Sequence, residues 1–187
     1  MARALVRAGI GADALTLVGF GLGLAAALAI VFGAPLAGLA LLTSSRLCDG
    51  LDGAVARLTR PTDRGAFLDI TLDFLFYASV PLAFAIANPA ANALPAAVLL
   101  AAFIGTGSSF LAFAVLAQKR GIASSDYPNK GLYYLGGLAE ATETLICFAL
   151  MCVWPERFAW WAYGFAALCA LTTGTRIIGG AKVLSRK

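Results

Sequence analysis

The 187-residue sequence contains no histidine, only four cysteines and few charged side chains, which make up 13% of the chain. The cysteines lie in apolar runs without paired metal-ligand spacing, so this pattern argues against a zinc site. We expect them to be small buried thiols. In soluble domains roughly a quarter of the residues are charged, so the scarcity of charge excludes an ordinary soluble domain.

What replaces the missing charge is apolar side chains, which account for 60% of the residues. Such a composition is typical of a membrane protein. The length suits one compact integral-membrane domain over residues 1–187, without an appended soluble module. The first residues include two arginines but no small-residue cleavage site after a short apolar core, so Leu15 onward is expected to be a retained span.

A membrane-spanning helix needs about 20 mostly apolar residues. Six stretches qualify: residues 14–32, 35–58, 65–87, 94–117, 132–154 and 159–179. Proline, glycine and polar residues mark the breaks between them, as in "FGAP", "TRPTDR" and "WPERF". The sequence therefore predicts an all-α integral membrane protein with six transmembrane helices.

Glycines in the first and fourth spans (Gly19, Gly21, Gly23, Gly105, Gly107) allow close helix packing or dimerisation.

The basic residues predict the orientation of these spans. In a six-span arrangement one side holds Arg3, Arg7, Arg57, Arg60, Arg64, Lys119, Arg120, Lys130, Arg176, Lys182, Arg186 and Lys187, whereas the other holds Arg157 beside Glu156. Cytoplasmic loops are enriched in Lys and Arg, so both termini are expected in the cytoplasm. We interpret the net charge of +4 mainly as a consequence of this orientation, and only secondarily as a source of attraction for anionic headgroups or phosphates. Nucleic-acid binding has no support.

Four aspartates stand where apolar residues would be expected. Asp49 and Asp52 are three apart near the cytoplasmic end of the second span, and Asp69 and Asp73 are four apart near the start of the third. Helical residues at these spacings share a face, and a short loop makes the two helices antiparallel neighbours, so both pairs can converge. Four carboxylates at membrane depth repel one another unless cations compensate. The pattern predicts a hard divalent cation such as Mg²⁺, which also leaves positions for substrate phosphates.

The alternative is that the aspartates cap helices or form ion pairs with Arg46, Arg57, Arg60 or Arg64. We adopt this interpretation for Asp63, which lies in the polar loop. For the other four it does not explain why the spacing repeats on two adjacent helices. Gly53 and Ala56 leave the helix surface beside the metal nearly bare, so a phosphate ligand can approach closely. Arg57 offers a fixed guanidinium to a phosphate or a carboxylate.

The residues Asp49-x-x-Asp52-Gly53-x-x-Ala56-Arg57 and Gly65-x-x-x-Asp69-x-x-x-Asp73 resemble the signature of the CDP-alcohol phosphotransferases. The intervening loop is one residue shorter than is usual in the family. The resemblance implies displacement on a CDP-linked diphosphate, with CMP leaving and Mg²⁺, or alternatively Mn²⁺, held by the four aspartates. It further implies that Asp73 is the base that takes the acceptor's proton, and that the cytidine nucleotide site is lined by Gly53, Ala56, Arg57 and Gly65. Family members resemble one another in forming homodimers.

By the same resemblance, the donor is expected to be CDP-diacylglycerol and the acceptor a polar alcohol, with the site facing the cytoplasm of a bacterial inner membrane. Cations near the cytoplasmic side, of which Lys130 and Arg176 are the preferred candidates, would favour a phosphorylated acceptor such as glycerol 3-phosphate or inositol phosphate. Glu140 and Glu143 are expected inside the fifth apolar helix. Buried carboxylates there could bind the hydroxyls of a neutral acceptor, pair with Arg176 or hold the metal helices, so the acceptor stays open.

Two other functions use aspartates and metal in a membrane. An intramembrane prenyltransferase also binds a diphosphate through Mg²⁺, but it normally needs more spans and two separated aspartate-rich motifs. A small divalent-cation transporter would leave Gly53, Ala56, Arg57 and Gly65 without an explanation. The sequence therefore favours a phosphotransferase of phospholipid synthesis.

Overall fold

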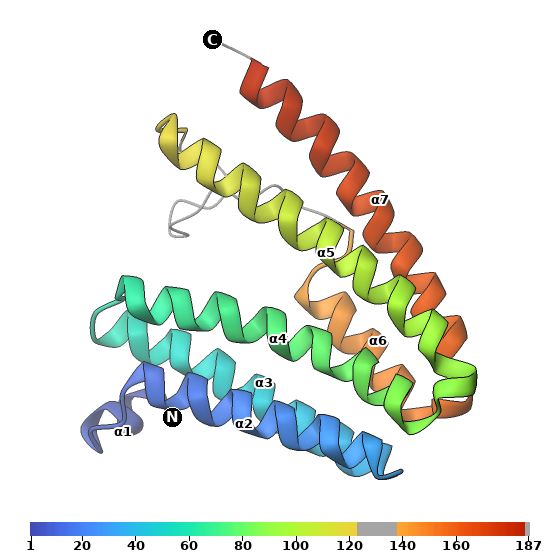
Figure 1. The fold of residues 1–187 in the computed structure, drawn as a ribbon. Coiled ribbons are helices and arrows are strands. Elements are labelled where there is room, and N and C mark those ends of the chain that lie inside the picture. Colours follow the sequence, from blue (N-terminus) through green and yellow to red (C-terminus); the bar gives the residue numbers. More distant parts are fainter. Residues whose placement is uncertain (123–137, 186–187) are drawn as a thin grey trace.

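The computed structural model describes residues 1–122 and 138–185, and the described part of the chain is helical, without strands. The elements are α1 (Ala2–Arg7), α2 (Ala12–Val31), α3 (Pro35–Leu58), α4 (Asp63–Ala87), α5 (Pro89–Lys119), α6 (Ala141–Val153), the short 3-10 helix η1 (Pro155–Arg157) and α7 (Phe158–Ser185). Figure 1 shows their order in space. The all-α prediction is confirmed for this part of the chain.

The helix boundaries follow local signals in the sequence. Pro35 begins α3 at the predicted residue, since proline is tolerated in the first turn where no N–H bond is needed. Thr62 caps α4, because its hydroxyl accepts a hydrogen bond from the Gly65 N–H at 3.0 Å. Asp63 is thus the first residue of α4 and lies at the positive end of the helix dipole. This agrees with its interpretation as a helix-terminal residue.

The predicted fifth span differs from what is observed. The described part of it is α6, a 13-residue helix, and residues 132–137 lie outside the described residues. A helix of this length is about 20 Å long, which is shorter than the hydrocarbon core of a bilayer. After α6 the chain turns by 116° into the segment that contains α7.

Among the described residues, three helices, α2, α4 and α5, are long and apolar enough to cross a membrane, and the bent pair of α6 with the segment after it would add a fourth crossing. The long helix α3 falls outside this set and carries four charged residues, Arg46, Asp49, Asp52 and Arg57. The chain is therefore an integral membrane protein by its apolar helices. The six-span topology and the cytoplasmic termini stay predictions.

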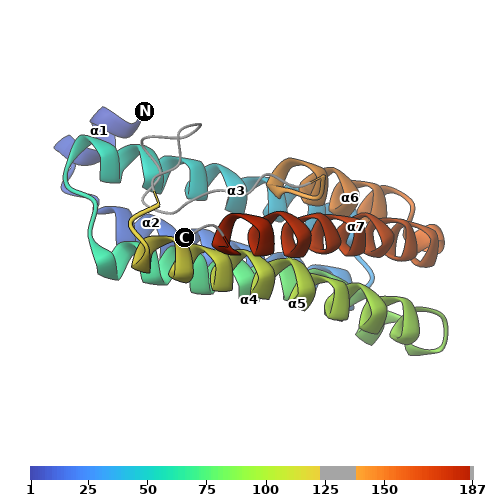
Figure 2. The ribbon, with the colours of Figure 1, turned by 90° about the horizontal axis from the view of Figure 1, so that it is seen from above.

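The helices form two groups joined through α4 and α6. In one group α2 packs against both α3 and α4, and in the other α5 packs against α7. α4 also contacts α5, while α6 lies between α3 and α7 at the end away from α1 (Figures 1 and 2). Large side chains with under 2% exposure fill the centre, including Phe76, Leu99, Phe148, Met151 and Phe158.

Glycines bring α2 close to its two neighbours. A Cβ atom at Gly19 would lie 3.1 Å from the Cβ of Cys48 on α3, and one at Gly23 would lie 2.5 Å from the Phe76 ring on α4. Gly21 has open space around it. The predicted close packing is thus confirmed for two of the three glycines in this helix, and it brings both α3 and α4 close to α2.

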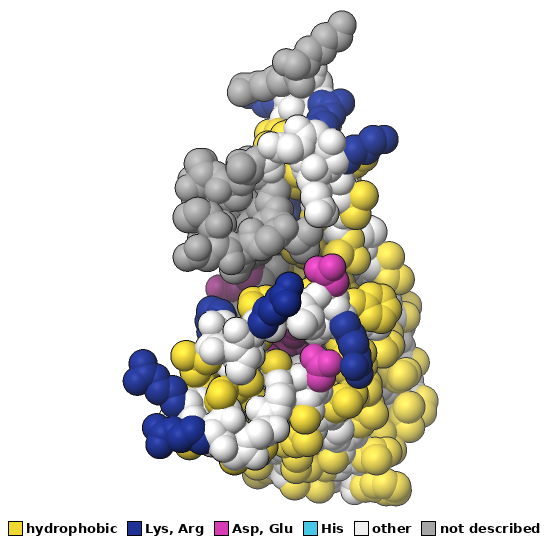
Figure 3. Space-filling model, turned by 90° about the vertical axis from the view of Figure 1, so that its left-hand side faces the viewer, with side chains coloured by type: hydrophobic (Ala, Val, Ile, Leu, Met, Phe, Trp, Pro, Cys, Tyr) yellow, Lys and Arg dark blue, Asp and Glu magenta, His cyan; other side chains and the backbone are white. Residues whose placement is uncertain are grey.

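α2 begins and α7 ends at the same end of the molecule (Figures 1 and 2). The face at this end carries Lys, Arg, Asp and Glu side chains, whereas the adjoining flank is hydrophobic (Figure 3). The charged side chains therefore separate from the apolar flank, as expected for a protein with one polar end and a lipid-facing side.

Candidate functional site

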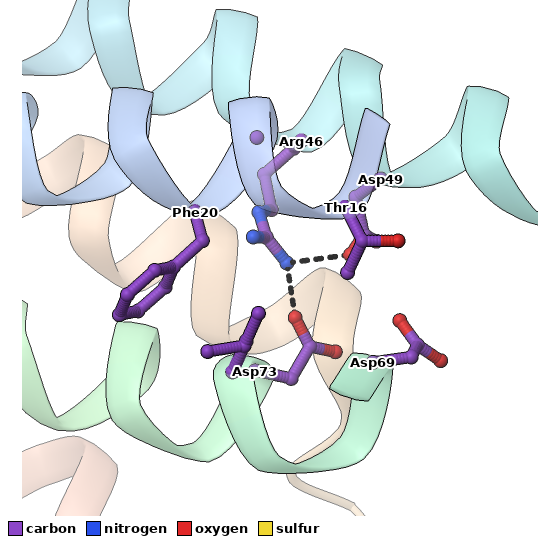
Figure 4. Close-up of a pocket in the computed structure, with 8 residues that line it drawn as sticks. Thr16, Phe20, Arg46, Asp49, Asp69 and Asp73 are labelled. Atoms are coloured by element: carbon purple, nitrogen blue, oxygen red, sulfur yellow. Dashed lines mark hydrogen bonds and ion pairs between the residues drawn. The ribbon is translucent and has the colours of Figure 1, made fainter. Parts of the chain in front are cut away.

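The acidic residues of α3 and α4 converge. Asp49, Asp69 and Asp73 each offer one carboxylate oxygen, and these three atoms lie within 4.8 Å of one another. Figure 4 shows the side chains pointing into one small pocket between the helices, which Thr16, Gly19, Phe20 and Leu72 also line. The side chains of Asp49 and Asp73 are 33% and 31% exposed, so they are open to a ligand. The predicted convergence of the two helical faces is confirmed for these three residues.

Asp52 is held apart from this group. Its side chain is buried, and its Oδ2 accepts a hydrogen bond from the Thr16 hydroxyl of α2 at 2.6 Å. Thr16 also donates to the Ala12 carbonyl, 3.1 Å away. This contact fixes Asp52 on the α2 side of the site, and its role as a fourth metal ligand stays a prediction. This contact was not predicted from the sequence.

Arg46 enters the site from α3. Its Nη1 lies 2.7 Å from Asp73 Oδ1 and 3.3 Å from Asp49 Oδ1, and its side chain is only 12% exposed. The guanidinium carbon stacks 3.9 Å above the centre of the Phe76 ring. Sequence reasoning considered Arg46 only as an alternative ion-pair partner. Its position three residues before Asp49 was the signal that it shares the face of the site.

The residues predicted to line a nucleotide site lie at the outer end of the same two helices. A Cβ atom at Gly53 would meet only the Arg57 Nη1, at 3.4 Å, so the surface there is bare, and Arg57 is exposed. Ala56 is half-buried. A Cβ atom at Gly65 would lie 3.2 Å from both Asp13 Oδ1 and Thr62 Oγ1. Gly53 thus leaves room for a ligand, whereas Gly65 is closely packed against two side-chain oxygens at the start of α4.

The prediction that Glu140 and Glu143 lie inside an apolar helix is wrong. Glu140 is the N-cap of α6, which begins at Ala141, and the Glu143 carboxylate accepts a hydrogen bond from the Glu140 N–H at 3.1 Å. Glu143 is exposed rather than buried. The two residues form a capping box, in which the N3 side chain satisfies the N-cap N–H that no helical carbonyl can reach. Their polarity is therefore explained by a helix start.

Of the two residues predicted to bind the acceptor phosphate, Lys130 and Arg176, the structure describes only Arg176. Lys130 lies outside the described residues. Arg176 lies within α7 at 9% exposure, donates from Nη1 to the Thr106 carbonyl at 3.2 Å, and has its guanidinium 5.7 Å from the centre of the Phe110 ring. Arg176 thus joins α7 to α5.

Known proteins that resemble this chain show its family. A family profile described as CDP-alcohol phosphatidyltransferase matches residues 10–174. The chain belongs to this family. As a CDP-alcohol phosphatidyltransferase it is a phosphotransferase enzyme, a transferase of phospholipid synthesis. The predicted resemblance is confirmed and extends from α2 well into α7.

Two curated relatives place this CDP-alcohol phosphatidyltransferase among bacterial and archaeal proteins. It is 54% identical over 178 residues to "Inner membrane protein YnjF" of Escherichia coli (strain K12), which covers 95% of this chain and 86% of that protein. It is 49% identical over 70 residues to "Archaetidylinositol phosphate synthase" of Methanothermobacter thermautotrophicus, covering 37% of this chain and 36% of the relative.

Among solved structures, the chain resembles Mycobacterium tuberculosis phosphatidylinositol phosphate synthase (PgsA1). The structure with CDP-DAG bound aligns with a TM-score of 0.70 at 25% identity, covering 96% of this chain and 90% of that one. The structure in complex with manganese and citrate aligns with a TM-score of 0.71 at 25% identity, covering 96% and 86%.

The donor set of this phosphatidyltransferase fits a divalent cation. Three carboxylates from α3 and α4 present oxygens to a common space, and hard divalent cations prefer such ligands. The sequence contains no histidine, and none of the four cysteines belongs to this group of ligand atoms, so the site offers oxygen ligands rather than nitrogen or sulfur. The acidic cluster is therefore a candidate divalent metal site.

Proposed function

We propose that this enzyme transfers the phosphatidyl group of CDP-diacylglycerol to the hydroxyl of a polar alcohol, releases CMP and depends on Mg²⁺. The observation that carries the proposal is the convergence of Asp49, Asp69 and Asp73 from two helices of a confirmed CDP-alcohol phosphatidyltransferase. The likeness to PgsA1, whose structure has CDP-DAG bound, supports the choice of donor.

Asp49, Asp69 and Asp73 would hold the metal, with Asp52 as the fourth ligand. When bound, the ion would neutralise charge on the donor diphosphate. Mg²⁺ is the proposed ion because it prefers carboxylate oxygens, and the manganese complex of PgsA1 supports Mn²⁺ as a substitute.

Asp73 is proposed to act as the base. The acceptor oxygen forms a bond to the phosphorus that carries the diacylglycerol, the bond from this phosphorus to the CMP oxygen breaks, and the acceptor proton passes to Asp73. One oxygen of Asp73 is bound to Arg46, and the other is left for the acceptor hydroxyl or the ion. Gly53, Ala56, Arg57 and Gly65 are proposed to line the cytidine nucleotide site, for which the bare surface at Gly53 is the support.

For the acceptor we propose a phosphorylated alcohol of the glycerol 3-phosphate or inositol phosphate type. The names of PgsA1 and of the archaeal relative, both inositol phosphate lipid synthases, support this choice. The capping role of Glu140 and Glu143 supports it too, because these carboxylates no longer need an acceptor hydroxyl as their partner. Lys130 and Arg176 stay the proposed phosphate ligands, and Arg176 would have to give up its contact with the Thr106 carbonyl.

The proposed setting is the inner membrane of a bacterium, with six spans, both termini and the active site on the cytoplasmic side, and a single domain that forms a homodimer. The name of the Escherichia coli relative supports the membrane, and the common end of α2 and α7 supports an even number of crossings.

The test is release of CMP by the purified protein in detergent with CDP-diacylglycerol and Mg²⁺. The acceptor panel would pair glycerol 3-phosphate with glycerol, inositol 1-phosphate with inositol, and add serine. We expect CMP only with a phosphorylated acceptor, a matching phospholipid product, and no release in EDTA. Release with inositol, glycerol or serine alone would overturn the acceptor class. No release with any acceptor would overturn the transferase assignment in favour of cation transport, which uptake of Mn²⁺ into vesicles would reveal.

A further inference from the structure

We propose that Arg46 is the positioning residue of the metal site: it holds one oxygen of Asp49 and one of Asp73, and thereby aims their second oxygens at the ion. This inference rests on the proposed metal-dependent function, and it assigns a role to a residue outside the family signature. Arg46 does not itself contact the ion in this proposal.

The contacts of a single nitrogen define the arrangement. Arg46 Nη1 donates a hydrogen bond to Asp73 Oδ1 at 2.7 Å and forms an ion pair with Asp49 Oδ1 at 3.3 Å, so the same nitrogen links an aspartate of α3 to one of α4. In both aspartates the bound atom is Oδ1, which leaves Oδ2 unengaged by the arginine. Figure 4 shows these second oxygens and the Asp69 carboxylate on the side of the cluster away from Arg46. The arginine thus closes one side of the cluster and leaves the other open to a cation.

Arg46 is itself held in place. The Phe76 ring supports one face of the guanidinium at 3.9 Å, and Nη2 donates to the Ser45 hydroxyl at 3.3 Å. Ser45 is fully buried and donates to the Gly19 carbonyl of α2 at 2.7 Å. These contacts tie the bridging nitrogen to all three helices of the site. A side chain fixed in this way can orient the carboxylates, whereas a mobile surface arginine could only add charge.

Burial of the charged Arg46 side chain costs free energy, which its contacts with Asp49 and Asp73 must offset. Its side chain is 12% exposed, and its Nε is buried without a hydrogen-bond partner among the described residues. Burying a charged group at membrane depth costs several kcal/mol or more, so such residues generally have a functional role. A neutral apolar residue would pack against Phe76 at lower cost, but it would leave Asp49 and Asp73 without a common partner.

The two possible roles of Arg46, positioning and simple charge compensation, predict opposite changes in metal affinity when the arginine is removed. If Arg46 only supplied positive charge, its removal would leave a more negative cluster and tighten binding of a divalent cation. If it orients the ligands, its removal would weaken binding, typically by about 10–100-fold for partners that orient metal ligands. The direction of the change therefore decides between the two roles.

The experiment is a titration of the purified enzyme with Mn²⁺, in which free Mn²⁺ is followed by electron paramagnetic resonance. The variants are Arg46→Met, Arg46→Gln and Arg46→Lys. We expect Arg46→Met to weaken binding by at least about tenfold, Arg46→Gln to weaken it less because the amide still donates, and Arg46→Lys to stay nearest to the wild type. In the Mg²⁺ dependence of CMP release, the half-saturating concentration should rise by a similar factor, while kcat at saturating Mg²⁺ changes less.

Arg64→Met is the matched control, because it removes a guanidinium at the same end of the molecule. Arg64 is 77% exposed and pairs with Asp13 at 3.5 Å, not with the acidic cluster. Unchanged or tighter Mn²⁺ binding in Arg46→Met would overturn the proposal, and equal losses in Arg46→Met and Arg64→Met would do the same. If Arg46→Met does not fold in detergent, the sign of the change in Arg46→Gln decides. A wild-type protein that binds no Mn²⁺ would instead count against the proposed function.

Discussion

The acidic pairs of α3 and α4 and the pair at the start of α6 have similar sequence spacings, three or four residues, but different structural roles. Asp49 and Asp73 lie within helices and converge with Asp69 on one pocket. Glu140 and Glu143 have the same i,i+3 spacing as Asp49 and Asp52, yet they cap a helix. Residues three or four apart share a face only where the helix continues through both, and at a helix start the same spacing serves the backbone. A carboxylate pair in an apolar stretch can therefore be assigned a function only when the boundaries of its helix are known.

The largest expected effect is on Asp73. Asp73→Asn removes the proposed base, so CMP release should fall by about 10²–10⁴-fold, the range for loss of general base catalysis. Binding of CDP should change little, and thermal unfolding measured alongside would show that the fold is intact. An Asp73→Asn enzyme with near-normal turnover would contradict the assigned role.

Thr16→Val tests whether Asp52 depends on its partner in α2. The substitution keeps the shape of the side chain but removes the 2.6 Å donor to a buried carboxylate. A hydrogen bond to a charged group contributes about 1.5–3 kcal/mol, so the variant should unfold at a lower temperature in EDTA. Differential scanning fluorimetry in detergent measures this. An unchanged melting temperature would show that Thr16 does not support Asp52.

Gly53→Val addresses the bare surface beside the cluster. The structure leaves space there for a Cβ atom, so the fold should tolerate the change, but the side chain would occupy the proposed nucleotide site. Crowding of about 1.4 kcal/mol would raise KM for CDP-diacylglycerol about tenfold. Gly50→Val is the control, since Gly50 is exposed on the same helix with open space around it. Equal KM values in the two variants would remove the support for a nucleotide site at Gly53.

The smallest expected effect concerns Glu143, and it tests the comparison directly. Glu143→Ala removes the bond to the Glu140 N–H, which should cost about 1 kcal/mol of stability. For a chain of this size that corresponds to a melting temperature about 2–4 °C lower. KM for the acceptor should not change, and Glu156→Ala, at the first turn of η1, is the control. A raised KM for the acceptor without loss of stability would contradict the capping role and would indicate that Glu143 binds the acceptor.

Much of the fold could be predicted because apolar runs and their breaks directly set the ends of long helices. The start of α3 at Pro35 and the capping of α4 by Thr62 both follow from local chemistry. The fifth span was predicted from apolarity alone, which does not distinguish a continuous helix from a shorter helix with its own cap. The number of membrane crossings likewise depends on whether α3 spans the bilayer. Its length would allow this, but its charged residues lower its hydropathy.

The candidate site could be predicted where the chemistry repeated on two helices. The convergence of Asp49, Asp69 and Asp73 could be predicted because acidic pairs at helical spacing repeat on two adjacent helices. Arg46 was not assigned a role, because an arginine beside aspartates equally suggests an ordinary ion pair. Its bridging nitrogen and its support by Phe76 depend on the contact between α3 and α4, which a single sequence does not contain.

The four charges of α3 have a consequence for how the protein is made. Each charged residue near the centre of a helix opposes insertion by the translocon by about 2.5–3.5 kcal/mol, so α3 is a poor candidate to enter the bilayer alone. α2 precedes it, is apolar enough to insert, and meets it through the bare surface of Gly19 and the bond from Ser45 to the Gly19 carbonyl. We therefore expect the two helices to insert as a hairpin, with α2 acting as the membrane anchor for the helix that carries Arg46, Asp49 and Asp52.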